Sequence, residues 1–586
     1  MKATLFKEVG YTLNKLLQDI EAGEIGLPDI QRPFIWKPAR VRDLFDSMYK
    51  GFPVGYLLFW ANGGGNGHRQ IGVGAKQVVP RLLIVDGQQR LTSLYAVLKD
   101  KPVLRDDYTQ LPIAIAFRPR DEKFEVTDAA IRKDPEFIAD ISILWREGVS
   151  EYHFITEFIQ NLRRHREVDK EDEGRLAANI DRLYDIQNYP FTALELSSTV
   201  DEEQVSDVFV RINSQGVTLN QADFILTLMS VFWDEGRMQL EQFCRAARHP
   251  SVQGSSPFNH FILPSPDQLL RVSMALGFRR ARLEHVYSVL RGKDMETGVF
   301  SADRRVQQFA TFIPAQSYAL DNVNWHEFFK CLLRAGYRGS SMVNSQVALL
   351  YSYALYLIGK RDHGVAPESL REIIARWFFM SALTQRYTTS PETAMEADLA
   401  RLRQAHTSTD FVAILDGIVC DTFTDDFWGI TLPNQLATSA ARSPALFAYF
   451  AALNLLEAKV LFSKLKVSEL LDPSVRSDKA ALERHHLFAR GYLRSIGITD
   501  LREVNQIANY AMVEWADNIE ISDQPPSVYV PKHEAGQTPE DLAQMRYWHA
   551  LPVGWQEMAY SEFLASRRRL MAQVIRDGFA RLQRAS

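Results

Sequence analysis

Cysteine is scarce in this 586-residue chain, and Cys244, Cys331 and Cys420 stand far apart without paired spacing. This pattern supports neither a disulfide framework nor a thiolate zinc site, and it suits a reducing cytosol. Long hydrophobic runs are missing too, because no stretch approaches the ~20 uninterrupted apolar residues of a membrane span. We therefore expect a cytoplasmic protein that has no membrane partner.

An excess of positive charge is also missing. The formal net charge of -5 argues against a chain that coats nucleic acid non-specifically, although it leaves room for local basic grooves. With 46% hydrophobic and 24% charged residues, the chain has a globular composition and exceeds the length that one core usually organises. We expect an α+β multidomain protein with an α+β N-terminal domain (1–235), a mainly helical middle region (236–445) and a helical C-terminal domain (446–586).

Hydrophobic periodicity predicts the elements of these domains. Strands are predicted at residues 55–60, 82–85, 111–117 and 191–196, and helices at 13–20, 41–49 and 163–182. Residues 347–358 and 370–383 are nearly apolar on all sides, which is typical of buried helices. A last predicted helix, residues 562–586, carries six arginines, which suit either a phosphate backbone or an ordinary solvated face.

A phosphate-binding P-loop is missing, because the glycine cluster at residues 63–67 lacks the Lys-Ser/Thr pair that holds phosphate and magnesium. A different polar turn, Asp86-Gly87-Gln88-Gln89-Arg90, lies where a predicted strand becomes a helix. Amides at a helix start bind phosphate, Gly87 permits close approach, and Arg90 can fork onto phosphate oxygens. Gln88 and Gln89 can orient water or base edges, and Asp86 can hold magnesium or polarise water. The same residues also suit a plain turn whose aspartate caps the helix.

Two further polar groups accompany this turn. Gln31-Arg32 lies between Pro28 and Pro33, and Arg211-Ile212-Asn213-Ser214-Gln215-Gly216 follows an apolar run. Together the three groups resemble the N-terminal domain of the GmrSD, SspE and BrxU-type restriction enzymes, which has a ParB/sulfiredoxin-like fold. The resemblance covers roughly residues 10–235 and implies binding and hydrolysis of a nucleoside triphosphate, GTP or ATP. The implied nucleotide-binding residues are Gln31, Arg32, Asp86, Gly87, Gln88, Gln89, Arg90 and Asn213.

A second constellation lies near the C-terminus, where the pair His485-His486 is followed by Asn509 and Asn518. A histidine pair on a half-apolar segment is often structural, but this order and spacing resemble the ββα-metal, or HNH-like, nuclease motif. The resemblance implies that His486 is the general base and that His485 and Asn518 bind a divalent metal, Mg²⁺ or Mn²⁺. Asn509 would fix the orientation of the histidine or the loop, and Asn505 competes with it for this role.

The C-terminal segment differs from the family pattern at one position. The family usually reads His-His-Ile-Phe-Pro, whereas this chain reads His485-His486-Leu487-Phe488-Ala489. Proline would stiffen the exit from the strand, but Ala489 removes no chemical group, so we expect the site to survive. The tail at residues 521–529 also resembles the family.

The two resemblances together imply a modification-dependent, type IV-like DNA restriction endonuclease in anti-phage defence. Triphosphate hydrolysis by the N-terminal domain would regulate metal-dependent cleavage of double-stranded DNA by the C-terminal domain, and we expect this DNA to be modified phage DNA. The rival hypothesis is a non-cleaving, nucleotide-switched DNA-binding or regulatory protein. The sequence leaves the oligomeric state open, with a homodimer among the options.

Overall fold

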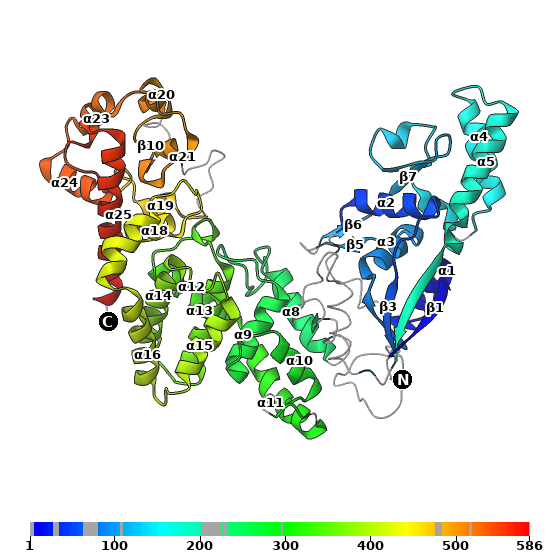
Figure 1. Cartoon of the computed structure of the whole chain (residues 1–586), viewed down its shortest axis with the longest axis horizontal. Coiled ribbons are helices and arrows are strands. Elements are labelled where there is room, and N and C mark those ends of the chain that lie inside the picture. Colours follow the sequence, from blue (N-terminus) through cyan, green and yellow to red (C-terminus); the bar gives the residue numbers. More distant parts are fainter. Residues whose placement is uncertain are drawn as a thin grey trace. The chain divides into compact units, whose positions relative to one another are not determined.

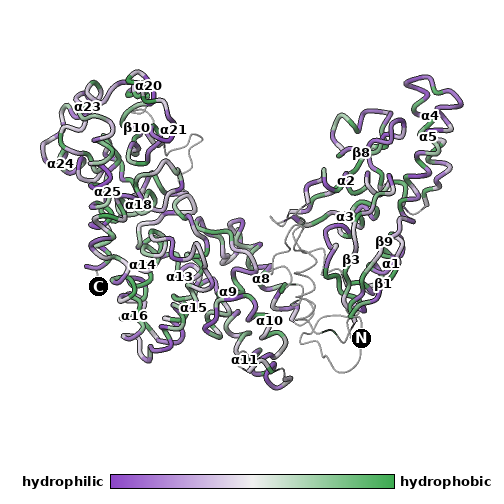
Figure 2. Tube along the Cα trace, in the orientation of Figure 1, coloured by the Kyte–Doolittle hydropathy of each residue, from purple (hydrophilic) through white to green (hydrophobic). Residues whose placement is uncertain are grey.

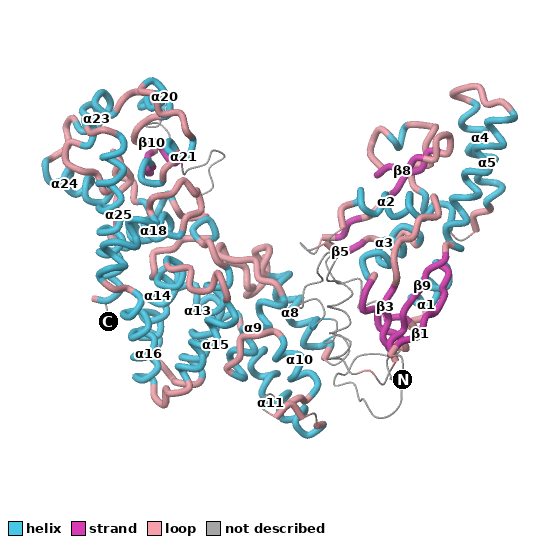
Figure 3. The backbone as a smooth tube through the Cα atoms, viewed as in Figure 1, coloured by secondary structure: helices cyan, strands magenta, loops and turns pink. Residues whose placement is uncertain are grey.

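The computed structural model describes residues 5–26, 34, 36–61, 80–105, 109–146, 148–197, 200, 225–226, 229, 233–294, 297–299, 301–474, 483–514 and 519–584. The chain divides into two compact units, Met1–Glu235 and Gly236–Ser586 (Figure 1). Most described strands belong to the first unit, and the second unit is mainly helical (Figure 3).

A five-stranded mixed sheet, in the order β1-β9-β3-β4-β2, organises the first unit. Its strands are β1 (Phe6–Thr12), β9 (Pro190–Leu196), β3 (Leu57–Ala61), β4 (Leu82–Asp86) and β2 (Ile25–Gly26). The pairs β1–β9 and β3–β4 are antiparallel, whereas β3–β9 and β2–β4 are parallel. The strands predicted at 55–60, 82–85 and 191–196 are confirmed, because alternate side chains such as Phe59 and Ile84 enter the core.

Three helices pack with this sheet, namely α1 (Leu13–Glu21), α2 (Pro38–Tyr49) and α3 (Gln88–Leu98). The helices predicted at 13–20 and 41–49 are confirmed. Thr12 caps α1 by accepting a hydrogen bond from the Lys15 amide at 3.2 Å. Leu16, Phe45 and Leu94, one from each helix, are fully buried in the core of the unit.

Two predicted elements of the first unit are wrong in extent. The strand predicted at 111–117 is two short strands, β6 (Gln110–Leu111) and β7 (Ile115–Arg118), which pair with β5 (Val103–Leu104) and β8 (Lys123–Val126). Pro112 follows β6 and has no amide hydrogen to continue a ladder. The helix predicted at 163–182 begins only at Lys170. The helix α4 (Glu151–Arg163) ends at Arg163, and Asp169 caps the start of α5 (Lys170–Tyr184). Single turns complete the unit at η1 (Ile131–Lys133), η2 (Ile141–Trp145) and η3 (Asp185–Asn188).

The second unit begins with α8 (Asp234–Ala246), which spans the boundary between the units. Its longer helices are α9 (Pro266–Phe278), α10 (Glu284–Arg291), α11 (Ala302–Ala319), α12 (Asn322–Arg334), α13 (Gln346–Arg361), α14 (Pro367–Leu383), α15 (Pro391–Leu402), α16 (Ser408–Thr422), α18 (Pro444–Leu455), α23 (Pro526–Glu534), α24 (Pro539–Trp548) and α25 (Tyr560–Gln583). Its short helices are η4 (Ser340–Met342), η5 (Phe427–Thr431), α17 (Leu432–Gln435), α19 (Val467–Leu470), α20 (Arg490–Ser495), α21 (Leu501–Val504), η6 (Ile507–Asn509) and η7 (Trp555–Glu557).

The apolar helices α13 and α14 lie inside the second unit, as predicted. The residues of α13 from Ala348 to Gly359 are all buried, and Trp377 in α14 is fully buried. Hydrophobic stretches mark this part of the trace in Figure 2. Among the described residues, none of the helices combines the length and apolarity needed to cross a membrane.

The long C-terminal helix α25 packs on α14 and α18, with the rings of Phe379 and Phe579 5.4 Å apart. Its arginines do not form a uniformly solvated basic face, because Arg567 is fully buried. Arg567 donates to the Ala508 carbonyl at 2.7 Å and to the His549 carbonyl at 3.1 Å. This arginine therefore holds internal loops together instead of presenting a charge to DNA.

Candidate functional sites

The polar turn of the first unit follows β4 directly. Asp86 ends the strand, Gly87 is the N-cap of α3, and Gln88 begins the helix. The capping alternative for Asp86 is wrong, because the cap residue is Gly87 and α3 has no side-chain cap. Instead, the Asp86 carboxylate accepts a hydrogen bond from Arg90 at 3.2 Å.

Arg90 is held by backbone as well as by Asp86. Its guanidinium donates to the carbonyls of Val54 at 2.6 Å and Tyr56 at 2.7 Å, both in the segment before β3. Burial lowers the pKa of Arg90, while the charge of Asp86 raises it. The sequence did not indicate these carbonyl partners, because they lie more than thirty positions earlier in the chain.

Two glycines leave room for this guanidinium. Gly87 has a φ of +94°, and a Cβ there would lie 2.4 Å from Leu57 Cδ2. Gly55 has a φ of +87°, and its Cβ would lie 2.7 Å from Arg90 Nη1. Positive φ and the absence of a side chain are both required at these positions. Gly87 therefore has a packing role, because it leaves room for Leu57 and for the Arg90 guanidinium, in addition to any role in ligand approach.

The structure describes only two of the remaining predicted nucleotide-binding residues. Gln88 is 9% exposed and Gln89 is half-buried, both in the first turn of α3. Gln31, Arg32 and Asn213 lie outside the described residues. The structure thus brings together Asp86, Gly87 and Arg90 of the predicted set.

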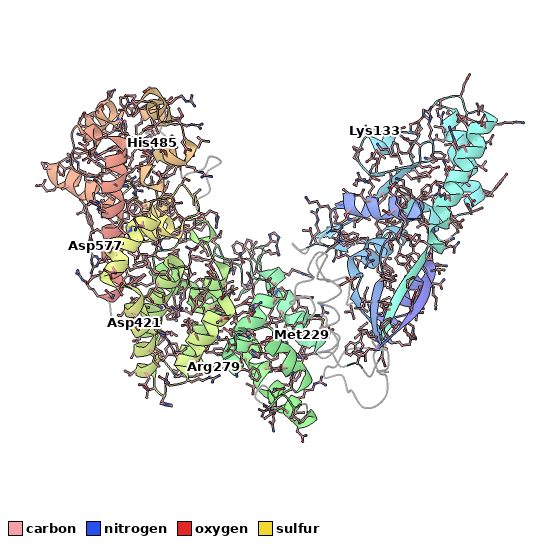
Figure 4. The ribbon with its side chains drawn as sticks, viewed as in Figure 1. Lys133, Met229, Arg279, Asp421, His485 and Asp577 are labelled. Atoms are coloured by element: carbon pink, nitrogen blue, oxygen red, sulfur yellow. The ribbon has the colours of Figure 1, made fainter. Side chains whose placement is uncertain are left out.

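The histidine pair lies on a two-stranded antiparallel ladder in the second unit. Strand β10 (Glu483–His486) pairs with β11 (Tyr510–Val513), with His485 opposite Ala511 and His486 opposite Tyr510. Figure 4 labels His485 in this region. Successive side chains of a strand point to opposite faces, and the two imidazoles accordingly have different neighbours. His485 is 4% exposed, and its ring meets that of Tyr529 edge-on at 6.0 Å.

His486 is half-buried and contacts Asn505. Its Nε2 lies 3.0 Å from Asn505 Oδ1, and its ring is 4.7 Å from the Tyr510 ring. Burial lowers the pKa of His486, the Asn505 hydrogen bond raises it, and the nearby charge of Arg490 lowers it. A lowered pKa keeps the imidazole neutral near pH 7, the form that accepts a proton.

Asn509 has a different position from Asn505. It is fully buried, and its Oδ1 accepts from the Phe488 amide at 2.9 Å. Its Nδ2 donates to the carbonyls of Phe488 and Val504, both at 3.1 Å. The structure therefore separates the two roles that the sequence left open, with Asn505 against the imidazole and Asn509 fixing the chain after β10.

Ala489 occupies the position at which the family pattern has proline. It is the N-cap of α20 with a φ of -58°, close to the value that a proline ring imposes. The backbone thus adopts a proline-compatible conformation without the proline. The tail at 521–529 packs on the same segment, because the Tyr529 hydroxyl donates to the Leu487 carbonyl at 2.7 Å.

The chemistry of the predicted donors fits a divalent ion, since a neutral imidazole and an amide oxygen are both common metal ligands. Asn518 lies outside the described residues. Within the described ranges, the histidine, cysteine, aspartate and glutamate side chains form no group of three suited to a metal. The ligand roles of His485 and Asn518 stay predictions.

These features define a two-unit α+β protein. One unit has a strand-to-helix turn in which Arg90 is bonded to Asp86, and the other has a half-buried histidine, His486, on a short ladder beside Asn505. Residues 13–230 match the family model of the GmrSD restriction endonuclease, N-terminal domain. The match places a GmrSD-type N-terminal domain in the first unit, as the resemblance of the N-terminal motifs predicted. The Uncharacterized protein MJ0686 of Methanocaldococcus jannaschii is 21% identical over 553 residues, covering 88% of this chain and 85% of that protein. This similarity extends over both units.

Proposed function

We propose that the protein is a DNA endonuclease of a modification-dependent restriction system, and that His486 is its general base. The observation that carries this proposal is the 3.0 Å contact between His486 Nε2 and Asn505 Oδ1, on an imidazole whose pKa burial lowers. An amide oxygen only accepts hydrogen bonds, so Nε2 carries the hydrogen and Nδ1 is the basic nitrogen.

In the proposed reaction, Nδ1 of His486 takes a proton from water, the water oxygen attacks phosphorus, and the phosphodiester bond breaks. Asn505 holds the ring in the productive tautomer, and Asn509 fixes the segment that leaves β10. A divalent ion, bound by His485 and Asn518, would stabilise the negative charge on the phosphate and the leaving oxygen. The Tyr529 hydroxyl holds the backbone next to His486 by donating a hydrogen bond to the Leu487 carbonyl.

We further propose that the first unit binds GTP or ATP and that hydrolysis regulates cleavage. The first turn of α3 would provide amides for a phosphate group. Arg90 would act mainly by holding the segment before β3, because its Nη1 and Nη2 bond to Val54 and Tyr56. Loss of Arg90 would then disturb the whole turn in addition to removing a charge.

The test uses the full chain with plasmid DNA and a panel of differently modified phage DNAs, with Mg²⁺ or Mn²⁺ and with or without GTP or ATP. We expect cleavage of at least one modified DNA and loss of that cleavage in His486→Ala. The exposed His249, placed after α8, provides a matched His249→Ala control. Intact DNA under every condition, or equal cleavage by His486→Ala, would contradict the nuclease assignment and favour the regulatory alternative.

A further inference from the structure

A pocket of about 410 Å³ lies in the helical part of the second unit, away from the ladder of β10 and β11 in the chain. Its wall combines three segments, which are the chain after α9, one face of α11 and the turn after α15. Arg279, with a φ of 56°, ends α9 and turns the chain toward Arg280. Arg279 is labelled in Figure 4.

The charges on this wall have one sign. Arg280, Arg304 and Arg403 line the pocket, and among the residues that the structure describes none of the lining side chains is acidic. Arg280 is oriented by Glu396 at 3.4 Å, and Arg304 by Asp294 and by Gln307 Oε1, the latter at 3.4 Å. Because a guanidinium has five N–H donors, each of these arginines keeps donors for a further acceptor.

Arg403 differs from the other two arginines. It is exposed, and within the described part of the chain it has no ion pair. It stands directly after the last turn of α15. Two pre-oriented guanidiniums and a third uncompensated one form a concave cationic surface, which is the arrangement that binds phosphate.

The uncharged part of the wall suits a nucleoside. Gln308 is 6% exposed, and its Nε2 donates to the Lys293 carbonyl at 2.8 Å. Its Oε1 is buried and has no hydrogen-bond partner within the described chain. A buried acceptor without a donor is costly unless a ligand or a water supplies one. The half-buried ring of Phe278 and the hydroxyl of Thr311 complete the wall with an apolar face and a polar group.

We propose that this pocket binds a nucleoside phosphate, with the phosphates against Arg280, Arg304 and Arg403. Its volume falls within the range of roughly 300–1,000 Å³ that is usual for small-ligand sites. The unpaired Gln308 acceptor and the half-buried ring of Phe278 favour a nucleoside phosphate over the backbone of a long duplex. The site goes beyond the proposed function, because it lies in the second unit and the regulatory triphosphate is proposed for the first.

The experiment measures binding of ATP and GTP to the full chain by calorimetry, with Arg403→Gln and Arg304→Gln as the test variants. Loss of one charge-assisted contact should weaken binding at this site by about tenfold. The matched control is Arg401→Gln, an exposed arginine in the last turn of the same helix, which does not line the pocket. Inorganic tripolyphosphate should compete with the nucleotide in the parent chain.

Three results would overturn the proposal. They are equal binding by the parent and both test variants, binding of a 30-base-pair duplex without any nucleotide binding, and loss of nucleotide binding in Arg90→Ala alone. DNA cleavage by the same proteins is measured in a separate assay. If the pocket binds no nucleotide, the assignment of His486 is therefore unaffected. Likewise, loss of DNA cleavage does not change the nucleotide-binding result.

Discussion

Replacing Asn505 tests the histidine site most directly. The side chain meets His486 Nε2 at 3.0 Å, and its own backbone amide is bonded to the Leu501 carbonyl at the end of α21. Asn505→Ala therefore removes the contact with the imidazole and leaves the backbone hydrogen bond that ends the helix. We expect a loss of activity without a comparable loss of stability.

The expected magnitude follows from a single hydrogen bond. Such a bond contributes about 0.5–1.5 kcal/mol, so the fraction of correctly oriented rings should fall by a factor of roughly 2–12. We expect kcat to decrease by up to about tenfold in Asn505→Ala. The midpoint of urea unfolding should change little, because Asn505 is half-buried and lies outside the core.

The pH dependence gives a readout that a purely structural role would not change. His486 acts as a base when neutral, so cleavage rises as the pH passes its pKa. The Asn505 hydrogen bond raises that pKa, and Asn505→Ala should therefore move the rising limb to lower pH. Asn505→Asp places a carboxylate beside the ring, which favours the charged imidazole and should move the limb to higher pH.

The assay is single-turnover cleavage of a susceptible modified DNA between pH 5 and pH 9. Gln506→Ala is the control, because that neighbouring amide bonds to the Arg502 carbonyl at 2.8 Å instead of to His486. Identical pH profiles for the parent, Asn505→Ala and Asn505→Asp would refute the positioning role. A shift of both variants in the same direction would also contradict the proposed tautomer.

The remaining predictions concern stability and backbone geometry. Asn509→Ala removes three buried hydrogen bonds and should lower the free energy of unfolding by about 2–4 kcal/mol, measured by urea titration. An unchanged unfolding midpoint would contradict the role of Asn509 in fixing the chain after β10. Gly87→Ala should lower the unfolding temperature, because its φ is positive and its Cβ would meet Leu57, whereas Gly10→Ala, with open space around it, serves as the control. Ala489→Pro should retain cleavage and stability, since φ is already -58°; unfolding of this variant would show that the segment needs the alanine.

Local sequence patterns determined much of the secondary structure. Residues 82–85 form a strand and 347–358 a buried helix because the spacing of apolar residues selects an element regardless of distant contacts. The same patterns failed at Pro112 and Asp169, where one proline and one capping residue interrupt otherwise continuous runs. Both interruptions are visible in the sequence, as a proline and as an aspartate of the type that caps helices.

The sequence by itself determined which residues stand near the site, namely the pair His485-His486 with Asn505 and Asn509 downstream. Only the tertiary structure decided which asparagine meets the imidazole, because that depends on the register of β10 and β11 and on the turn after α21. The same holds for Arg90, whose acceptors lie in the segment before β3, and for the pocket at Arg403. These contacts join positions far apart in the chain, and the folded packing places them together.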